Sequence, residues 1–248
     1  KIGRGHFSTV WEVEEMQSNL KVAMKIQKSA KNYRLSAMEE ISIHAYLSRK
    51  KHEGSKYINM MLYNNVYKGS NGKHTCMVFD LNDCDLHTFV HGNDNCVCNL
   101  ETTSAIAFQI LSGLDFIHSR GIIHTDLKPE NILVKYIAEV PKIQIGDFGT
   151  ACIDGDRSMD FLQTSHYRSP EIILRYKYWS TPIDIWSCAC IFFEMLTNDY
   201  LFDGENEADL VHAMVELLGM PRSSFLNDCR SKRLYFDRTG LLLQGNIC

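Results

Sequence analysis

The 248-residue sequence predicts an α+β fold in two lobes, a small β-rich N-terminal lobe (residues 1–81) and a larger helical C-terminal lobe (residues 82–248). The prediction rests on a change of pattern near residue 82. Before this point, runs rich in β-branched and aromatic residues alternate with turn signals, which is typical of strands. After it, apolar residues recur at the spacing of a helix. No internal repeat is present, so the order of the elements determines the architecture.

The N-terminal lobe is expected to hold several strands and one helix. Strands are predicted for the segment that ends VAMKI, for the LYNNVY run and for HTCMVFDL, with a turn at residues 69–72 (GSNG). The helix is predicted over residues 35–48, where apolar residues fall at roughly helical spacing. Its inward face would carry Leu35, Met38, Ile41, Ala45 and Leu47.

Three helical patterns follow in the C-terminal lobe. The first is a stripe made of Ile106, Ile110, Leu111, Leu114 and Ile117. Residues 183–196 are apolar nearly all round, which predicts a buried central helix. Residues 207–218 predict an amphipathic helix that ends before Gly219 and Pro221. Its inward residues would be Leu210, Met214, Leu217 and Leu218.

The composition is that of an ordinary water-soluble globular protein, with 45% hydrophobic and 23% charged residues and no long uncharged apolar run. We therefore expect no membrane span. The net charge of −4 disfavours direct binding of nucleic acid and permits basic partners.

The nine cysteines are irregularly placed and do not form the even framework of a small secreted scaffold. We expect reduced thiols and a cytoplasmic or nuclear protein. A zinc site built from the two C-x-C pairs, Cys96 with Cys98 and Cys188 with Cys190, is disfavoured because no C-x2-C spacing or paired histidines accompany them.

The run GRGHFSTV at residues 3–10 fits a glycine-rich loop that covers phosphates, because small residues let backbone N–H groups approach phosphate oxygens. A plain hairpin turn is the alternative for Gly3 and Gly5. Lys25 then ends an apolar strand-like VAMK, where its ammonium needs a polar partner. Glu40, in the predicted helix, would pair with Lys25 and aim it at phosphates, whereas Glu39 points about 100° away round the helix.

The most specific signal is HTDLKPEN at residues 124–131, followed by IGDFG at residues 145–149. Asp126 would orient or accept the proton of a substrate hydroxyl, and Lys128 would neutralise the transferred phosphoryl group. Asn131 and Asp147 would bind Mg²⁺, which prefers oxygen ligands. The alternative, that these residues are solvated turn residues, is disfavoured by their order and spacing.

Together these motifs resemble the catalytic domain of eukaryotic protein kinases over residues 1 to about 226. The resemblance implies an ATP- and Mg²⁺-dependent enzyme, with the adenine against the hinge at residues 80–82 and Phe79 as gatekeeper. A lysine two residues after Asp126 is the serine/threonine pattern. His124 is expected to pack behind the catalytic loop. The residues implied for nucleotide binding are Ile2, Gly3, Gly5, Ser8, Val10, Ala23, Lys25, Phe79, Asp80, Asn82 and Leu133.

Two further segments, SPE at 169–171 and DIWS at 184–187, resemble structural parts of the same fold. Asp184 would hold the catalytic loop through backbone N–H groups. Glu171 would normally pair with an arginine from a late helix, and that arginine is not identifiable. Because the tail RLYFDRTGLLLQGNIC does not resemble the final kinase helices, we expect those helices to be missing or replaced.

Within the kinases, the chain is most similar to the SR-protein kinases, which phosphorylate arginine/serine-rich splicing factors. The strings that carry this resemblance are GHFSTVW, VAMKIQKSA, CMVFD, HTDLKPENIL, IGDFGTAC and DYLF. The LAMMER-type dual-specificity kinases share HTDLKPEN and are the alternative, but their namesake motif would fall near residues 208–215, which read ADLVHAMV. The chain departs from the SR-protein pattern in two ways. The family usually carries a long spacer between its lobes, but here only residues 136–141 separate NILV from KIQIGDFG. Ser165 and Pro170 stand where the family often has arginine and leucine.

Thr125 stands where most kinases have an arginine that binds a phosphorylated activation loop. The resemblance therefore implies an enzyme that is active as folded, although Thr125 could instead cap the turn and Arg168 could bind a phosphate. Asp199, Asp209 and Glu216 match an acidic groove that grips arginine-rich substrates, and the peptide would lie across Asp126 and Arg168. An ordinary solvated helix face is the alternative for Asp209 and Glu216.

The predicted function is thus a monomeric serine/threonine protein kinase whose partners are arginine/serine-rich proteins. A pseudokinase scaffold is the alternative from another class, supported by the unrecognised tail and opposed by the presence of Lys25, Asp126, Asn131 and Asp147. A small-molecule kinase is disfavoured by the SPE and YRS segments, which resemble a peptide platform.

Overall fold

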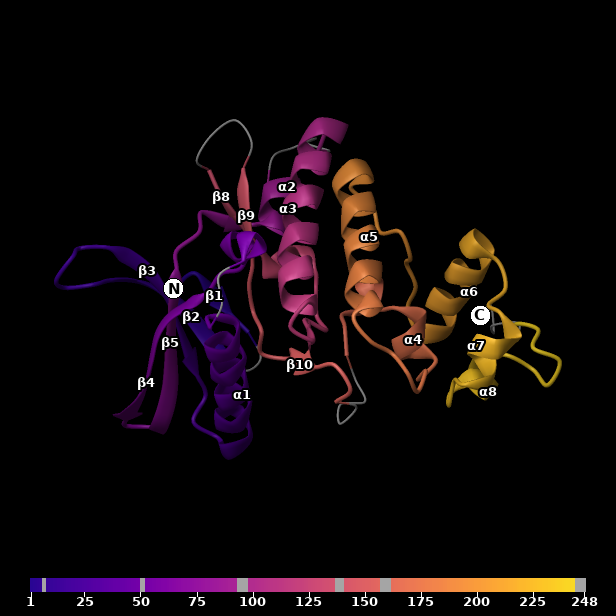
Figure 1. Ribbon diagram of the computed structural model, residues 1–248, viewed down its shortest axis with the longest axis horizontal. Coiled ribbons are helices and arrows are strands. Elements are labelled where there is room, and N and C mark those ends of the chain that lie inside the picture. The colour runs from indigo at the N-terminus through magenta and orange to yellow at the C-terminus, as the bar shows by residue number, and fades with distance from the viewer. Residues whose placement is uncertain (6–7, 50–51, 93–97, 137–140, 157–161, 244–248) are drawn as a thin grey trace.

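The computed structural model describes residues 1–248 except 6–7, 50–51, 93–97, 137–140, 157–161 and 244–248. The N-terminal lobe is built on an antiparallel sheet with strand order β1-β2-β3-β5-β4 (Figure 1). The predicted strands and the turn at residues 70–71 are confirmed. The strands are β1 (Gly3–Arg4), β2 (Ser8–Glu14), β3 (Lys21–Gln27), β4 (Met61–Gly69) and β5 (Gly72–Asp80).

Helix α1 (Lys31–Leu47) packs against β3, β4 and β5, but its inward face differs from the prediction. Leu35 and Met38 are 50% and 56% exposed. The buried residues are Ala37, Glu40, Ile43, His44 and Leu47. The face is set by the buried ion pair of Glu40 with Lys25, so a polar residue, rather than the apolar count, decides which side turns inward.

The C-terminal lobe is mainly helical, which confirms the predicted α+β class (Figure 1). A 3-10 turn, η1 (Glu53–Tyr57), connects α1 to β4 and contacts α3. The further helices are α2 (Leu86–His91), α3 (Leu100–His118), α4 (Pro170–Ile173), α5 (Pro182–Thr197), α6 (Glu207–Leu218), α7 (Ser223–Asn227) and α8 (Lys232–Tyr235). The 3-10 turns η2 (Pro129–Asn131) and η3 (Ser165–Tyr167) complete it.

The core of this lobe lies between α3 and α5, which stand side by side at the centre of the molecule (Figure 1). Four residues of the predicted α3 stripe are 0–1% exposed, whereas Leu111 is 42% exposed and was wrongly assigned to it. Helix α5 is the predicted buried central helix. In α6, Leu210 and Met214 are buried as predicted, but Leu217 and Leu218 are exposed because they lie in its last turn.

Short strands position the two loops that carry the candidate catalytic residues. β6 (Cys84–Asp85), β8 (Ile132–Lys135) and β9 (Lys142–Ile145) form one small sheet, and β7 (Ile122–Ile123) pairs with β10 (Cys152–Ile153). Residues 124–131 therefore run between β7 and β8, and Asp147 lies two residues after β9. The backbone N–H of Gly146 donates to the carbonyl of Asn131 (2.8 Å), which brings the two loops together.

The unfamiliar C-terminal segment is part of the core. Tyr235 and Phe236 are 8% and 1% exposed and belong to the main hydrophobic cluster, and Phe236 forms an antiparallel bridge with Leu242. Within the part of the chain that the structure describes, no helix is both long and apolar enough to cross a membrane.

Candidate active site

Lys25 joins the two lobes through two carboxylates. Its ammonium lies 2.8 Å from both oxygens of Glu40 and 2.8 Å from Oδ1 of Asp147. Strand β3 presents Lys25 between Val10 of β2 and Met77 of β5, and α1 brings Glu40 to it. Glu39 is exposed, as expected from its position round the helix. The predicted pair is therefore formed, and Asp147 is a second partner that sequence spacing did not indicate.

Burial alone would lower the pKa of Lys25, but the charges of Asp147 and Glu40 outweigh it and raise this pKa. The same ammonium lowers the pKa of Asp147 to about 2. Burial raises the pKa of Glu40, and the charge of Lys25 opposes this. The cluster consequently keeps a cation at a site that phosphate oxygens could reach, with Asp147 ionised at neutral pH.

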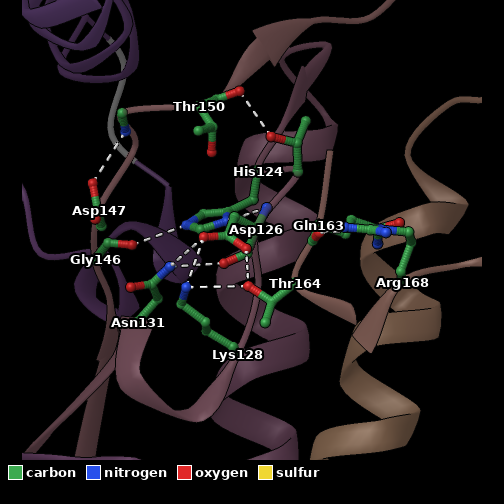
Figure 2. A network of polar contacts seen from close by, with 12 residues as sticks. His124, Asp126, Lys128, Asn131, Gly146, Asp147, Thr150, Gln163, Thr164 and Arg168 are labelled. Atoms are coloured by element: carbon green, nitrogen blue, oxygen red, sulfur yellow. Dashed lines mark hydrogen bonds and ion pairs between the residues drawn. The ribbon is translucent and has the colours of Figure 1, made fainter. Parts of the chain in front are cut away.

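The catalytic loop gathers Asp126, Lys128 and Asn131, and Thr164 reaches them from the segment before η3 (Figure 2). The hydroxyl of Thr164 donates to Oδ1 of Asp126 (2.7 Å), and Nζ of Lys128 lies 3.1 Å from Oδ2 of Asp126 and 3.1 Å from Oγ1 of Thr164. The amide of Asn131 donates to the carbonyl of Asp126 (2.8 Å). Sequence reasoning missed Thr164, whose only signal is a hydroxyl residue shortly before SPE.

Asp184 of α5 holds this loop from behind. Its carboxylate is fully buried and accepts hydrogen bonds from the backbone N–H groups of His124 (2.8 Å) and Thr125 (2.9 Å), and it lies 2.8 Å from Nε2 of His118. His124 is buried and its Nε2 contacts the carbonyl of Gly146 at 2.9 Å. The predicted supporting roles of Asp184 and His124 are confirmed.

Thr125 has a left-handed backbone with φ of 67°, which is uncommon for a β-branched residue and needs firm support. Its hydroxyl donates to the carbonyl of Thr150 (2.8 Å), and its carbonyl accepts from the backbone N–H of Gln163 (2.9 Å) (Figure 2). The segment between Asp147 and Glu171 is thus bonded to Thr125 of the catalytic loop at Thr150 and at Gln163, without a phosphate.

Asn131 and Asp147 suit a hard cation. The amide nitrogen of Asn131 is engaged by Asp126, which leaves its oxygen for a ligand, and the Asp147 side chain is 53% exposed although Oδ1 is paired with Lys25. An amide oxygen and a carboxylate are ligands that Mg²⁺ accepts. The residues present therefore fit the predicted metal.

The predicted nucleotide residues lie on both lobes. Gly3 pairs with Val10, and the N–H of Gly5 donates to the carbonyl of Ser8 (3.0 Å), so the glycine segment folds back over β2. Residues 6–7 of this segment lie outside the described residues. The backbone N–H of Ile2 donates to the carbonyl of Val10 (3.0 Å). Ser8 is buried.

At the hinge, Ala23 pairs with Phe79 across β3 and β5, and the Phe79 ring is buried against His44, as a gatekeeper would be. Asp80 is exposed at the end of β5. The side-chain amide of Asn82 donates to Oε1 of Gln144 (3.1 Å). Leu133 comes from β8 and packs near Gly146.

The Arg168 guanidinium, predicted to lie under the substrate peptide or to bind a phosphate, is engaged within the protein. The side chain is 8% exposed. It donates to the carbonyls of Leu162 (3.0 Å) and Gln163 (2.8 Å) and to Glu207 of α6 (2.8 Å). These bonds brace the backbone at Gln163, whose φ is 61°. The N–H donors of the Arg168 guanidinium are therefore occupied within the protein, where they stabilise this strained turn.

The three predicted docking carboxylates are placed differently. Asp199 and Glu216 are exposed, after α5 and near the end of α6. Asp209 is partly buried, and its Oδ2 accepts from the backbone N–H of Glu205 (3.1 Å) and from the Asn206 amide (2.8 Å). It therefore organises the start of α6 as well as adding charge to that face.

Cys96, of the disfavoured zinc pair, and most of the short spacer at 136–141 lie outside the described residues. Cys188 and Cys190 are buried and not in disulfides, and burial raises the pKa of Cys190 to about 12. Among the described residues, no cluster of three or more histidine, cysteine or acidic side chains is arranged to hold a metal ion.

Comparison with known proteins gives consistent matches. The sequence profile of the protein kinase domain matches residues 1–233. Dual specificity tyrosine-phosphorylation-regulated kinase 3 of Mus musculus is 37% identical over 97% of this chain and 40% of its own length. Serine/threonine-protein kinase SRPK of Physarum polycephalum is 33% identical over 98% of this chain and 71% of its own length. Against the mouse relative and its counterparts, the chain thus spans about 40% of the protein.

Proposed function

The chain belongs to the protein kinase family, and on this basis we propose that it transfers the γ-phosphate of ATP to serine or threonine side chains of proteins. One observation carries the proposal. The ammonium of Lys25 in β3 is held by Glu40 and Asp147, and the carboxylate of Asp126 is held by Thr164 and Lys128. The loops that carry Asp126 and Asp147 are bonded to each other through Asn131 and Gly146. The groups that phosphoryl transfer requires are therefore assembled in the folded chain.

Each side chain has a distinct task. Lys25 binds phosphate oxygens, and Glu40 keeps its ammonium in position. Asp126 orients the acceptor hydroxyl and takes its proton, as its bond from the Thr164 hydroxyl at 2.7 Å supports. Lys128 neutralises charge on the transferred group. Asn131 and Asp147 hold Mg²⁺, which when bound supplies positive charge to the phosphate oxygens.

For the substrate, we propose arginine/serine-rich proteins. Asp199, which follows α5, and Glu216, in α6, are exposed carboxylates, and the chain has a net charge of −4. One relative carries the name serine/threonine-protein kinase SRPK. The buried cysteines Cys76, Cys188, Cys190 and Cys229 are not in disulfides, which supports a cytoplasmic or nuclear location, and we propose that the chain acts as a monomer with no direct nucleic-acid or membrane partner.

A dual-specificity kinase is the second candidate, because several relatives carry that description in their names. Lys128, two residues after Asp126, favours alcohol acceptors over phenols. A tyrosine peptide included in the same transfer assay decides between the two candidates. The pseudokinase alternative is disfavoured because Lys25, Asp126, Asn131 and Asp147 are not only present but correctly grouped.

The substrate proposal is tested by charge reversal. Asp199→Lys with Glu216→Lys is expected to raise KM for an arginine/serine-repeat peptide much more than for a short generic peptide. These positions are preferable to Asp209, whose reversal would also disturb the start of α6. Glu53→Lys, at an exposed site in η1, is the matched control.

The difference between the two peptides should shrink as salt is added, because exposed charges are screened beyond a Debye length of about 8 Å at physiological ionic strength. The measurement is kcat/KM for both peptides at low and high salt. An equal loss for both peptides at every salt concentration would remove the arginine/serine assignment and leave the kinase assignment intact.

A further inference from the structure

Tyr235, the last residue of α8, holds its hydroxyl against the start of α6. The residue belongs to the main hydrophobic cluster and is 8% exposed. Its hydroxyl donates to Oε2 of Glu207, the first residue of α6 (2.9 Å). Helices α6, α7 and α8 lie together at one end of the molecule (Figure 1). A buried phenol usually has a hydrogen-bond partner, and here the partner is a carboxylate from another helix.

The backbone on both sides of Tyr235 is fixed by bonds that do not involve its side chain. Before α8, the N–H of Ser231 donates to the carbonyl of Leu174 (3.0 Å). After α8 the chain turns back, and the N–H of Leu243 donates to the carbonyl of Tyr235 (2.8 Å). The Asp237 carboxylate accepts hydrogen bonds from two backbone N–H groups of this turn. The Tyr235 hydroxyl can therefore be removed without breaking the bonds that place the residue.

Glu207 divides its two oxygens between Tyr235 and Arg168. Oε2 accepts from the Tyr235 hydroxyl, and Oε1 accepts from Nη1 of Arg168 (2.8 Å). The Glu207 side chain is 37% exposed, so burial alone does not fix its orientation. Burial and the Glu207 carboxylate raise the pKa of Tyr235 to about 12, so the phenol keeps its proton and remains a donor at neutral pH. The hydroxyl thus restricts Glu207 to the orientation in which Oε1 faces the guanidinium.

Arg168 carries this restraint to the catalytic loop. Its Nη2 donates to the carbonyl of Gln163 (2.8 Å), whose φ of 61° lies in the left-handed region (Figure 2). The next residue along the chain, Thr164, donates its hydroxyl to Oδ1 of Asp126 (2.7 Å) (Figure 2). An uninterrupted series of hydrogen bonds and one peptide link therefore leads from Tyr235 to Asp126.

We propose that Tyr235 is a positioning residue for the peptide acceptor. Its hydroxyl orients Glu207 and, through Glu207, the Arg168 guanidinium, which keeps the turn at residues 163–164 against Asp126. A phenylalanine would fill the same apolar space but would leave Oε2 of Glu207 without this donor. The series of contacts does not pass through the groups that hold Lys25, so the affinity for ATP is independent of the hydroxyl.

The experiment compares the wild-type chain with Tyr235→Phe, Glu207→Ala, the double variant and the control Tyr67→Phe, which removes the hydroxyl of an exposed tyrosine in β4. The first readout is kcat/KM for a serine peptide, which rests on the proposed function, and the second is Kd for ATP. The third requires no catalysis: hydrogen exchange of the backbone amides of Gln163 and Ser169, which are bonded to the Thr125 carbonyl and to the Gln163 side chain.

We expect Tyr235→Phe to lower kcat/KM for the peptide about three- to tenfold and to leave Kd for ATP unchanged. Exchange protection of the two amides should fall by a similar factor, while Tyr67→Phe behaves like the wild type. In the Glu207→Ala background, Tyr235→Phe should have no further effect, because the hydroxyl acts through that carboxylate. If Glu207→Ala fails to fold, the comparison of Tyr235→Phe with the wild type still decides.

The proposal is overturned if Tyr235→Phe keeps the wild-type kcat/KM for the peptide and the wild-type protection of both amides. It is also overturned if Tyr235→Phe weakens ATP binding by the same factor as it lowers kcat/KM, or if its effect is undiminished in the Glu207→Ala background. A wild-type chain that transfers no phosphate to any peptide would contradict the proposed function alone, because the exchange data would still report on Tyr235.

Discussion

Removing the negative charge of Glu40 should destabilise the protein far more than removing that of its neighbour. The Glu40 side chain is 1% exposed and both of its oxygens lie 2.8 Å from Nζ of Lys25. In Glu40→Gln, one oxygen can still accept, but the new amide NH2 faces an ammonium that is itself buried. Lys25 would then depend on Asp147 alone.

The size of the loss follows from this geometry. Breaking a buried ion pair by removing one partner costs about 3–5 kcal/mol. Because Lys25 keeps Asp147 at 2.8 Å, we expect the lower part of that range or slightly less, about 2–3 kcal/mol. For a domain of this length, this corresponds to a fall of roughly 4–12 °C in Tm.

The assay is urea unfolding at pH 7.5 of the wild type, Glu40→Gln and the matched control Glu39→Gln. Glu39 is exposed on the same helix, so its substitution should change the free energy of unfolding by no more than about 0.5 kcal/mol. Peptide phosphorylation by Glu40→Gln should also fall, since Lys25 is no longer held. Equal stability of the two variants would refute the assigned role of the buried pair.

Two other outcomes follow from the site. Asp147→Ala should weaken Mg²⁺-dependent ATP binding more than Asn131→Ala, because a carboxylate neutralises metal charge and an amide does not; calorimetric titration showing the reverse order would count against these ligand roles. Phosphatase-treated protein should retain its kcat, because Thr125 already bonds the Asp147–Glu171 segment to the catalytic loop at Thr150 and at Gln163. Activity that appears only after phosphorylation within this segment would contradict that account.

Much of the fold could be predicted because its elements carry local signals. The strands of the N-terminal lobe follow runs rich in β-branched and aromatic residues and a Gly-rich turn, and α5 is apolar on nearly every side. The inward face of α1 could not be predicted in this way. It is chosen by Glu40 and His44, and their burial depends on Lys25, Phe79 and Phe148, which are distant in sequence.

For the site too, local sequence strings could be interpreted and contacts between distant segments could not. Asp126, Asn131 and Asp147 lie in short strings whose spacing alone indicates their chemistry. Thr164 and the second partner of Lys25 were not predictable, because each contact joins segments more than thirty residues apart. The contacts of Arg168 were not predictable either, because charge in a sequence does not reveal that a guanidinium donates to the carbonyls of a left-handed turn.

The central claim is tested most directly by phosphate incorporation into a serine peptide from Mg-ATP, measured for the wild type and Asp126→Asn alongside their affinity for ATP. Asparagine keeps an oxygen for the Thr164 hydroxyl but cannot accept the proton of the acceptor. We predict a loss in kcat of about 10²–10⁴-fold with ATP affinity little changed. Equal turnover in the two proteins would contradict the claim that this carboxylate performs phosphoryl transfer.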